Sequence, residues 1–205
     1  MSWKSHSIRV VPLVTGSVEL EVYSLAPHGN GFQVSDLGFL QHARSGLLVV
    51  MSPDGRPENA PIAKRYDANL KKFTRSLADI VEQGMAGRHP DAIVELPSTR
   101  NFNKPYTAEI LTRFPAARDL TLIVDRHGNV KSGEDASFDE VLADTFIHGT
   151  DGLDTLKTVL LVDDILAEGK TAAAIVDRLR EAGLSSKARI VLAVPLVTYK
   201  SAPVG

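Results

Sequence analysis

The sequence contains no cysteine. This absence excludes a disulfide framework and any metal site built from thiolate ligands, and it fits a reducing compartment. An excess of positive charge is also missing, because 23 Lys and Arg residues face 25 Asp and Glu residues and leave a formal net charge of -2. This balance disfavours a dominant basic surface, so nucleic acid is not predicted as a partner.

Long apolar runs are missing as well. The stretch from Met1 to Val14 carries two early basic residues, and Pro12 interrupts its apolar run. That run is too short to span a bilayer, and no convincing cleavage site follows it, so we expect a cytoplasmic protein with no membrane partner. The 205 residues, of which 43% are hydrophobic, suffice for one domain with a small appended subdomain.

The N-terminal part of the chain is rich in β-like patterns. The stretches Ile8–Val14 and Val18–Leu25 predict two strands joined by a short turn, and Leu47–Met51 predicts a third strand. We therefore expect residues 1–65 to form a β-rich N-terminal subdomain and residues 66–205 to form a separate core.

Helical and strand patterns alternate after residue 65. Apolar residues at helical spacing between Tyr66 and Gln83 predict an amphipathic helix that ends near Gly84. The alternation that follows indicates an α/β fold with a mostly parallel sheet flanked by helices, while the polar segment Asp125–Ser137 predicts a loop. Further strands are expected at Ala92–Leu96, Leu120–Val124, Val159–Val162 and Ala188–Val194, and further helices near Thr107–Phe114, Phe138–Asp144 and Thr171–Ala182.

The segment 159–171 combines a strand, two acids and the start of a helix. Val159–Val162 is a continuous apolar run, typical of a strand buried on both faces, and Asp163 and Asp164 follow at its carboxyl end, where open α/β sheets bind ligands. The free N–H groups of the following helix can hold a phosphate, and Gly169 permits its close approach. Adjacent carboxylates can accept hydrogen bonds from ribose hydroxyls or orient waters around Mg²⁺. The segment therefore predicts a sugar-phosphate site.

This thirteen-residue string resembles the phosphoribosyl pyrophosphate (PRPP) motif of type I phosphoribosyltransferases, with four apolar residues, two acids, two apolar residues and a short Thr/Gly-rich loop. The resemblance implies the fold of that family with a small β-rich hood, ribose contacts from Asp163 and Asp164, and proton transfer assisted by Asp164. It also implies Mg²⁺ bound together with PRPP, with no metal site made by the protein alone. The implied 5-phosphate contacts come from Ala167, Glu168, Gly169, Lys170 and Thr171.

Two positions of the loop depart from the family pattern. Ala167 and Glu168 stand where the family commonly has two Thr, which removes hydroxyl donors and adds a negative charge. A like charge about 4 Å from a phosphate would cost on the order of 4 kcal/mol at an effective dielectric constant of about 20. We therefore expect the Glu168 side chain to point to solvent, to pair with Lys170 or to alter the ligand. Its backbone N–H can still donate to the phosphate.

A second polar loop follows the strand that ends near Leu96. In the family, the loop after an early strand binds pyrophosphate, which implies contacts from Ser98, Thr99 and the guanidinium of Arg100. Lys104 would add positive charge to this site. A plainer alternative is the start of a helix with solvated basic residues.

The same loop carries a second resemblance. Arg100, Phe102 and Asn103 stand in an Arg-x-Phe-Asn order that is similar to the Arg-Gly-Phe-Asn stretch of the late-competence (ComF-like) branch of these proteins. Asn101 replaces the Gly of that stretch.

The polar segment from Asp125 occupies the place where many family members carry a flexible loop that closes over the substrate. Closure would exclude water from a cation-like transition state. The resemblance implies that Arg126, His127 or Lys131 neutralises the departing pyrophosphate, with Arg126 and Lys131 preferred, whereas a solvated loop is the plainer alternative for each residue.

The implied reaction is the transfer of ribose 5-phosphate from PRPP to a nitrogenous acceptor, with release of pyrophosphate. The acceptor is left open, and a homodimer is compatible with the resemblance. The rival interpretation is a non-catalytic PRPP- or nucleotide-sensing module, because regulators share the fold and the residues at Ala167 and Glu168 could reflect lost catalysis.

Three further alternatives remain for the segment 159–171. Gly169, Lys170 and Thr171 reproduce the end of a phosphate-binding P-loop, G-x-x-x-x-G-K-[ST], but Asp164 occupies the position of its first Gly and only about one strand follows. Paired acids after an apolar strand can also form a polar turn with a helix cap. A structural partner of another macromolecule would not bind PRPP at all.

Overall fold

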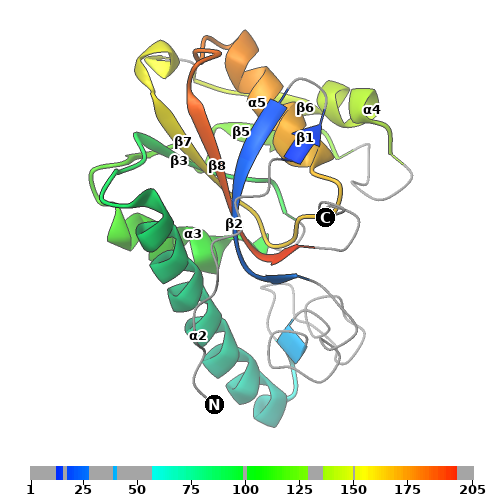
Figure 1. Ribbon diagram of the computed structural model, residues 1–205. Helices are drawn as coiled ribbons and strands as arrows, with labels where there is room; N and C mark the ends of the chain where they lie inside the picture. The colour runs from blue at the N-terminus through cyan, green and yellow to red at the C-terminus, as the bar shows by residue number, and fades with distance from the viewer. Residues whose placement is uncertain are drawn as a thin grey trace.

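A six-stranded, mostly parallel sheet forms the centre of the fold (Figure 1). The computed structural model describes residues 13–15, 18–27, 39–40, 57–98, 101–128, 136–149 and 151–197. The strand order is β1-β2-β8-β7-β3-β4, and every neighbouring pair is parallel except β1 and β2. The predicted α/β class with a mostly parallel sheet is thereby confirmed. The strands are β1 (Leu13–Thr15), β2 (Val18–Pro27), β3 (Ala92–Glu95), β4 (Arg118–Asp119), β7 (Thr158–Val162) and β8 (Arg189–Val197).

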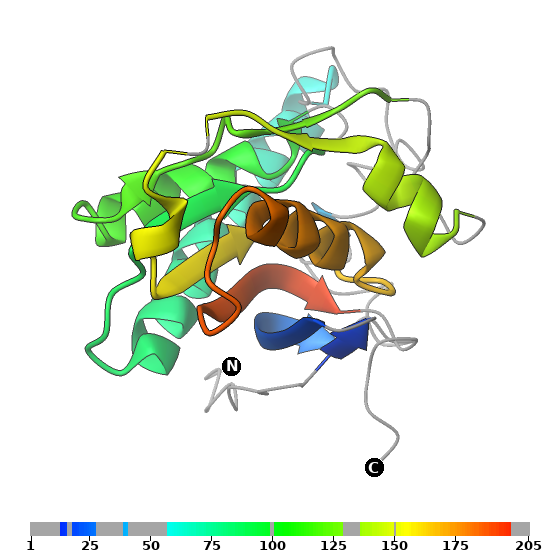
Figure 2. The ribbon, with the colours of Figure 1, turned by 90° about the horizontal axis from the view of Figure 1, so that it is seen from above.

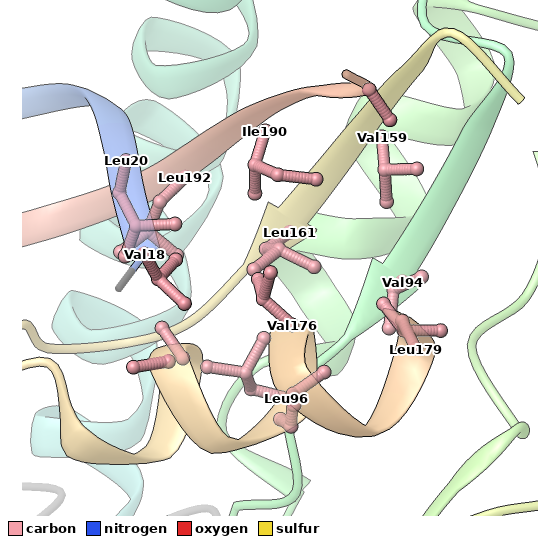
Figure 3. Close-up of a cluster of buried hydrophobic side chains, with 14 of the residues drawn as sticks. Val18, Leu20, Val94, Leu96, Val159, Leu161, Val176, Leu179, Ile190 and Leu192 are labelled. Atoms are coloured by element: carbon pink, nitrogen blue, oxygen red, sulfur yellow. The ribbon is translucent and has the colours of Figure 1, made fainter. Parts of the chain in front are cut away.

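Helices cover both faces of this sheet. α2 (Ala60–Met85) and α3 (Lys104–Arg113) lie on one face and α5 (Lys170–Glu181) on the other (Figure 1). Leu161 of β7 packs with Val176 of α5 (Figure 3). Its neighbour Leu160 instead joins the cluster that contains Tyr106 of α3. Burial on both faces explains why the β7 sequence is continuously apolar rather than alternating.

The N-terminal strand β2 belongs to the main sheet. We expected Val18–Leu25 in a β-rich subdomain, but β2 pairs in parallel with β8, with Glu21 opposite Val191, and on its other side with β1. Thr15 and Val18 are paired, and the predicted turn at Gly16 and Ser17 lies outside the described residues. The predicted strand Leu47–Met51 and most of residues 28–56 lie outside the described residues, so a boundary at residue 65 stays a prediction.

The long helix α2 begins earlier than its apolar pattern predicts. Asn59 precedes it, and the Asn59 side chain accepts a hydrogen bond from the Ile62 N–H at 3.3 Å. Pro61 lies in the first turn, where its missing N–H costs nothing. The cap and the proline, rather than apolar periodicity, therefore mark the start at Ala60.

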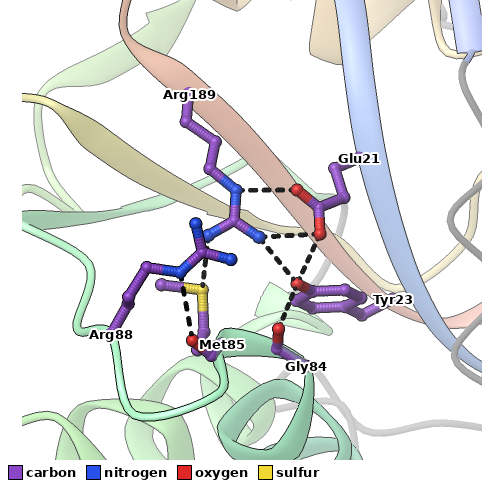
Figure 4. Close-up of polar contacts among 6 residues, drawn as sticks. All are labelled: Glu21, Tyr23, Gly84, Met85, Arg88 and Arg189. Carbon is purple, nitrogen blue, oxygen red and sulfur yellow. Dashed lines mark hydrogen bonds and ion pairs between the residues drawn. The ribbon is translucent and has the colours of Figure 1, made fainter.

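A polar network ties the end of α2 to the sheet (Figure 4). Arg189, the first residue of β8, donates from Nε and Nη2 to the two carboxylate oxygens of Glu21, at 2.7 Å each. Arg189 Nη2 also donates to the Tyr23 hydroxyl, at 2.9 Å. The Tyr23 hydroxyl lies 2.6 Å from Glu21 Oε1 and 2.8 Å from the Gly84 carbonyl oxygen, so its single proton has two acceptors. The network joins β2, β8 and the last turn of α2.

The predicted strand Leu120–Val124 is wrong. The structure has a two-residue edge strand, β4, then a turn in which Leu122 is 88% exposed, and then β5 (Val124–Arg126). β5 pairs antiparallel with β6 (Thr145–Ile147), which the sequence did not predict. The predicted loop consequently begins after Arg126 rather than at Asp125.

The helix α4 (Phe138–Ala143) confirms its prediction and begins with a capping box. The Ser137 hydroxyl accepts from the Glu140 N–H at 3.2 Å, and the Glu140 carboxylate accepts from the Ser137 N–H at 2.8 Å. α4 lies beside α5 (Figure 2), where Arg178 Nη2 donates to the Leu142 carbonyl oxygen at 2.9 Å. Within the described ranges, no helix has both the length and the apolar character that crossing a membrane requires.

Candidate ribose-phosphate site

The two adjacent acids lie at the carboxyl end of β7. The Asp163 N–H donates to the Ala193 carbonyl oxygen of β8 at 3.1 Å, and further along the Leu166 N–H donates to the Leu196 carbonyl oxygen at 2.8 Å. Residues 163–166 therefore run beside the carboxyl end of β8 before α5 begins. The predicted order of buried strand, two acids and helix is present, at the sheet edge where parallel α/β folds bind ligands.

Asp163 and Asp164 have different surroundings. One oxygen of Asp163, Oδ1, accepts from the Asp164 N–H at 2.8 Å and from Asn103 Nδ2 at 3.3 Å. Burial raises the pKa of Asp163 well above its ordinary value, and the negative charge of Asp164 raises it further, while both hydrogen bonds act mainly in the opposite direction. Asp163 is thus held by hydrogen bonds from the Asp164 backbone and from the Asn103 side chain.

The loop that follows opens α5 at a glycine. Gly169 is buried and has φ 75° and ψ 5°, the left-handed conformation that glycine adopts without strain. Its carbonyl oxygen accepts the first helical hydrogen bond, from the Ala173 N–H at 2.9 Å. No side chain caps this helix start, so the N–H groups of its first turn can hydrogen-bond an anion.

Glu168 pairs with Lys170. Lys170 Nζ lies 2.6 Å from Glu168 Oε2 and donates to the Ala136 carbonyl oxygen at 2.8 Å. Of the three arrangements expected for Glu168, the pairing with Lys170 is therefore the one observed. The ion pair offsets the negative charge of Glu168, and the second contact joins this loop to the segment before α4.

The second loop contains a left-handed residue. Asn101 has φ 55°, a conformation that glycine adopts freely and that asparagine tolerates better than most residues. This conformation explains how Asn101 can stand where the similar family stretch has Gly. The Ser98 Oγ accepts from the Phe102 N–H at 2.8 Å, which stabilises the turn. Thr99 and Arg100 lie outside the described residues.

Asn103 joins the two loops. Its side chain is fully buried, and its Nδ2 donates to the Leu96 carbonyl oxygen at 2.7 Å and to Asp163 Oδ1 at 3.3 Å. The sequence analysis included Asn103 in the Arg-x-Phe-Asn order but gave it no role. Its place in that order was the only sequence signal.

Glu95 is a third carboxylate at this edge that the sequence analysis missed. It ends β3 opposite Val162 of β7, directly before the segment that leads into the second loop. Burial raises its pKa, while a hydrogen bond from Thr107 and the nearby charge of Lys104 act against that rise. Lys104 itself is exposed and is the first residue of α3.

Arg126 lies in an ion pair within the β5–β6 region. Its Nη2 and Nε lie 3.0 and 3.1 Å from Asp144 Oδ2, and the two side chains are only 11% and 2% exposed. This partner ties β5 to the end of α4. Lys131 lies outside the described residues. A role at the departing pyrophosphate stays a prediction for both Arg126 and Lys131.

Comparisons with known proteins give fold neighbours only. No protein-family model matches the chain, and no curated protein is significantly similar to it. The similar solved structures include an adenine phosphoribosyltransferase with a TM-score of 0.44 and 16% identity, which covers 78% of this chain and 98% of that chain. Adenine phosphoribosyltransferase from Saccharomyces cerevisiae has a TM-score of 0.46, 16% identity and coverage of 78% and 88%. Orotate phosphoribosyltransferase from Aeropyrum pernix has a TM-score of 0.40, 16% identity and coverage of 82% and 95%. Similarity at this level decides no function, which must be argued from the site of this chain.

Proposed function

We propose that the chain binds PRPP and transfers its ribose 5-phosphate group to a nitrogen acceptor, with release of pyrophosphate. The observation that supports this most is the pair of acids at the carboxyl end of β7, followed by a Gly169-opened helix start without a side-chain cap. Adjacent carboxylates suit the neighbouring hydroxyls of ribose, and the open N–H groups suit its phosphate. One sugar phosphate would satisfy both the carboxylates and the N–H groups.

Each part of PRPP has proposed partners. The ribose hydroxyls would hydrogen-bond to Asp164 and Asp163, and the 5-phosphate to the loop at Ala167–Thr171. The pyrophosphate would lie against Lys104 and the Ser98–Arg100 loop. These assignments follow the order of the two loops along neighbouring strands β7 and β3.

Mg²⁺ fits this site as a companion of PRPP. The part of the chain that the structure describes holds no group of three or more His, Cys, Asp or Glu residues able to bind a metal ion. Two adjacent carboxylates are hard oxygen donors, and Mg²⁺ commonly takes its other ligands from substrate phosphates and water. When bound, Mg²⁺ would offset negative charge on the pyrophosphate.

The transfer needs positioning and charge stabilisation rather than a covalent intermediate. The bond between ribose C1 and the pyrophosphate oxygen breaks, that oxygen keeps the bonding electrons, and the acceptor nitrogen forms a new bond to C1. The nitrogen then loses its proton, which Asp164 would accept in this scheme. Backbone and cationic groups of the Ser98–Arg100 loop and Lys104 would stabilise the leaving pyrophosphate.

We place the chain closest to the late-competence (ComF-like) branch within this family. Asn101 supports this placement because its φ of 55° is one that the Gly of the branch pattern adopts readily. Cytoplasmic location and a homodimer remain predictions, to be tested by fractionation and light scattering.

A non-catalytic PRPP or nucleotide sensor is the second candidate. The observation that favours it is the Glu168–Lys170 ion pair at 2.6 Å, which engages the only lysine of the proposed phosphate loop, residues 167–171. Release of pyrophosphate from PRPP, assayed with a panel of purine and pyrimidine bases, separates the two candidates. We expect acceptor-dependent release that Asp164→Asn abolishes. Saturable PRPP binding without release would instead identify a sensor.

A further inference from the structure

We propose that Asn103 is a positioning residue, whose buried amide holds the Asp163 carboxylate in the orientation that receives the ribose. This inference rests on the proposed function, because it concerns the ribose-binding part of that site. Asn103 would act through Asp163 and would not touch the ligand itself.

The side chain of Asn103 is turned away from its own helix. Asn103 precedes α3 at the N-cap position, where asparagine normally accepts a hydrogen bond from the first turn. Here the backbone carbonyl of Asn103 accepts from the Tyr106 and Thr107 N–H groups at 3.0 Å each, but the side chain makes no capping bond. The Asn103 amide therefore does not cap α3, although its position favours that role.

The Asn103 amide instead donates to two oxygens from other parts of the chain. Nδ2 lies 2.7 Å from the Leu96 carbonyl oxygen and 3.3 Å from Asp163 Oδ1. Both partners are acceptors, so they fix the amide with its nitrogen toward them. Oδ1 of Asn103 is buried and has no hydrogen-bond partner within the described ranges. A buried acceptor without a hydrogen bond is unfavourable. The two hydrogen bonds of Nδ2 must therefore outweigh that cost to keep the amide in this orientation.

The two contacts place Asp163 relative to both strands. Leu96 follows β3, and its N–H donates to the Val162 carbonyl oxygen of β7 at 2.9 Å. The Asn103 side chain therefore links the end of β3 to Asp163, the first acid after β7. Because Asn103 and the Asp164 N–H both donate to Asp163 Oδ1, two hydrogen bonds from different segments hold that oxygen in place.

The test compares three ligands by titration calorimetry: PRPP, ribose 5-phosphate and inorganic pyrophosphate, each with Mg²⁺. We expect Asn103→Ala to weaken binding of PRPP and of ribose 5-phosphate by the same factor, about tenfold, because Asp163 loses its orienting donor and the ribose loses about one well-placed hydrogen bond to that carboxylate. Binding of pyrophosphate should change less than about twofold, because Asp163 does not contact it. Asn103→Asp replaces the donor with a charged acceptor and should weaken ribose 5-phosphate binding further.

Thr107→Ala is the matched control. Its hydroxyl lies 3.1 Å from the Asn103 carbonyl oxygen and also hydrogen-bonds Glu95, so the variant perturbs the same helix start and the end of β3 without removing a contact of Asp163. It should lower thermal stability and leave ribose 5-phosphate affinity unchanged. Asn103→Ser, too short to reach Asp163, replaces Asn103→Ala if that variant does not fold, with the same expected loss.

Two results would overturn the inference alone. One is ribose 5-phosphate affinity within about twofold of wild type in a folded Asn103→Ala or Asn103→Ser variant, and the other is an equal loss of pyrophosphate affinity, which indicates a general disturbance of the loop. Wild type that binds neither PRPP nor ribose 5-phosphate would overturn the proposed function and this inference together.

Discussion

Single residues set the charge of the phosphate loop. The family pattern has uncharged Thr near the position of Glu168, and the carboxylate here is offset by Lys170 at 2.6 Å. The two side chains are 34% and 26% exposed, so solvent weakens this pair and a competing phosphate can draw Lys170 away.

We predict that Glu168→Gln tightens PRPP binding by roughly two- to fivefold, because Lys170 becomes available to the phosphate and a repulsive charge is removed. Titration calorimetry measures the change. Glu181→Gln, at the other end of α5, is the control and should have no effect. Unchanged or weaker binding in Glu168→Gln would show that the carboxylate does not oppose the ligand.

Tyr23 gives a second prediction at this scale, concerning pH. Burial, followed by the hydrogen bond and charge of Glu21, raises the pKa of Tyr23 to about 12 from an ordinary 10.0. Because the folded-state pKa is the higher one, the stabilisation from the protonated hydroxyl is complete below pH 10 and is lost as the pH approaches 12. The difference in unfolding free energy between wild type and Tyr23→Phe should therefore shrink across that interval. Urea denaturation at several pH values measures it, and a difference that stays constant would contradict the assignment.

At the scale of elements, the contact between α2 and the sheet depends on a glycine. A Cβ atom at Gly84 would lie 2.6 Å from Cζ of the buried Tyr23 ring. Helix propensity alone predicts that Gly84→Ala stabilises the protein by about 1 kcal/mol, whereas overpacking costs about 1–3 kcal/mol.

We predict a net loss of stability in Gly84→Ala, measured as a lower denaturation midpoint in urea. The neighbouring exposed residue supplies the control, since Gln83→Ala changes the same helix without a clash and should stay within about 0.5 kcal/mol of wild type. A more stable Gly84→Ala would mean that the ring moves aside freely.

The β5–β6 pair depends on the ion pair between Arg126 and Asp144. Removing Arg126 leaves the Asp144 carboxylate, only 2% exposed, without this cation. We predict that Arg126→Ala lowers the free energy of unfolding by about 3–5 kcal/mol and that Arg126→Ala/Asp144→Ala loses less than the two single variants combined. Chemical denaturation tests this structural role. A stable Arg126→Ala with impaired pyrophosphate release would favour the catalytic role instead.

Elements with strong local signals could be predicted from sequence. The apolar runs of β3, β7 and β8 and the periodic helix α5 agree with their predicted positions within a few residues. The run Leu120–Val124 has the composition of a strand, yet its pairing with β3 stops at Leu120, whose N–H donates to the Ile93 carbonyl oxygen at 2.9 Å. The chain then turns away to pair β5 with β6. Composition does not report whether a partner strand is available.

On the scale of the whole molecule, non-local pairing was the part that the sequence could not show. β2 joins β8 from the opposite end of the chain, and no local pattern distinguishes this parallel pairing from a hairpin in a separate subdomain. The residues of the site likewise divide into those that a local motif marks and one that depends on contacts between distant segments. Asp163, Asp164 and Gly169 are marked by a contiguous string, whereas the choice of Asn103 between capping α3 and reaching Asp163 depends on packing between distant segments.

The central claim is that the carboxyl edge of this sheet binds PRPP, and titration calorimetry with Mg²⁺ tests it most directly. Wild type should bind PRPP saturably, and Asp163→Asn/Asp164→Asn should lose that binding while keeping a wild-type circular dichroism spectrum. Asp177→Asn/Glu181→Gln, which likewise removes two negative charges but from the partly exposed side of α5, is the charge-matched control and should bind normally. Folded wild type that takes up no PRPP, or a folded double variant that binds it as well as wild type, would contradict the claim.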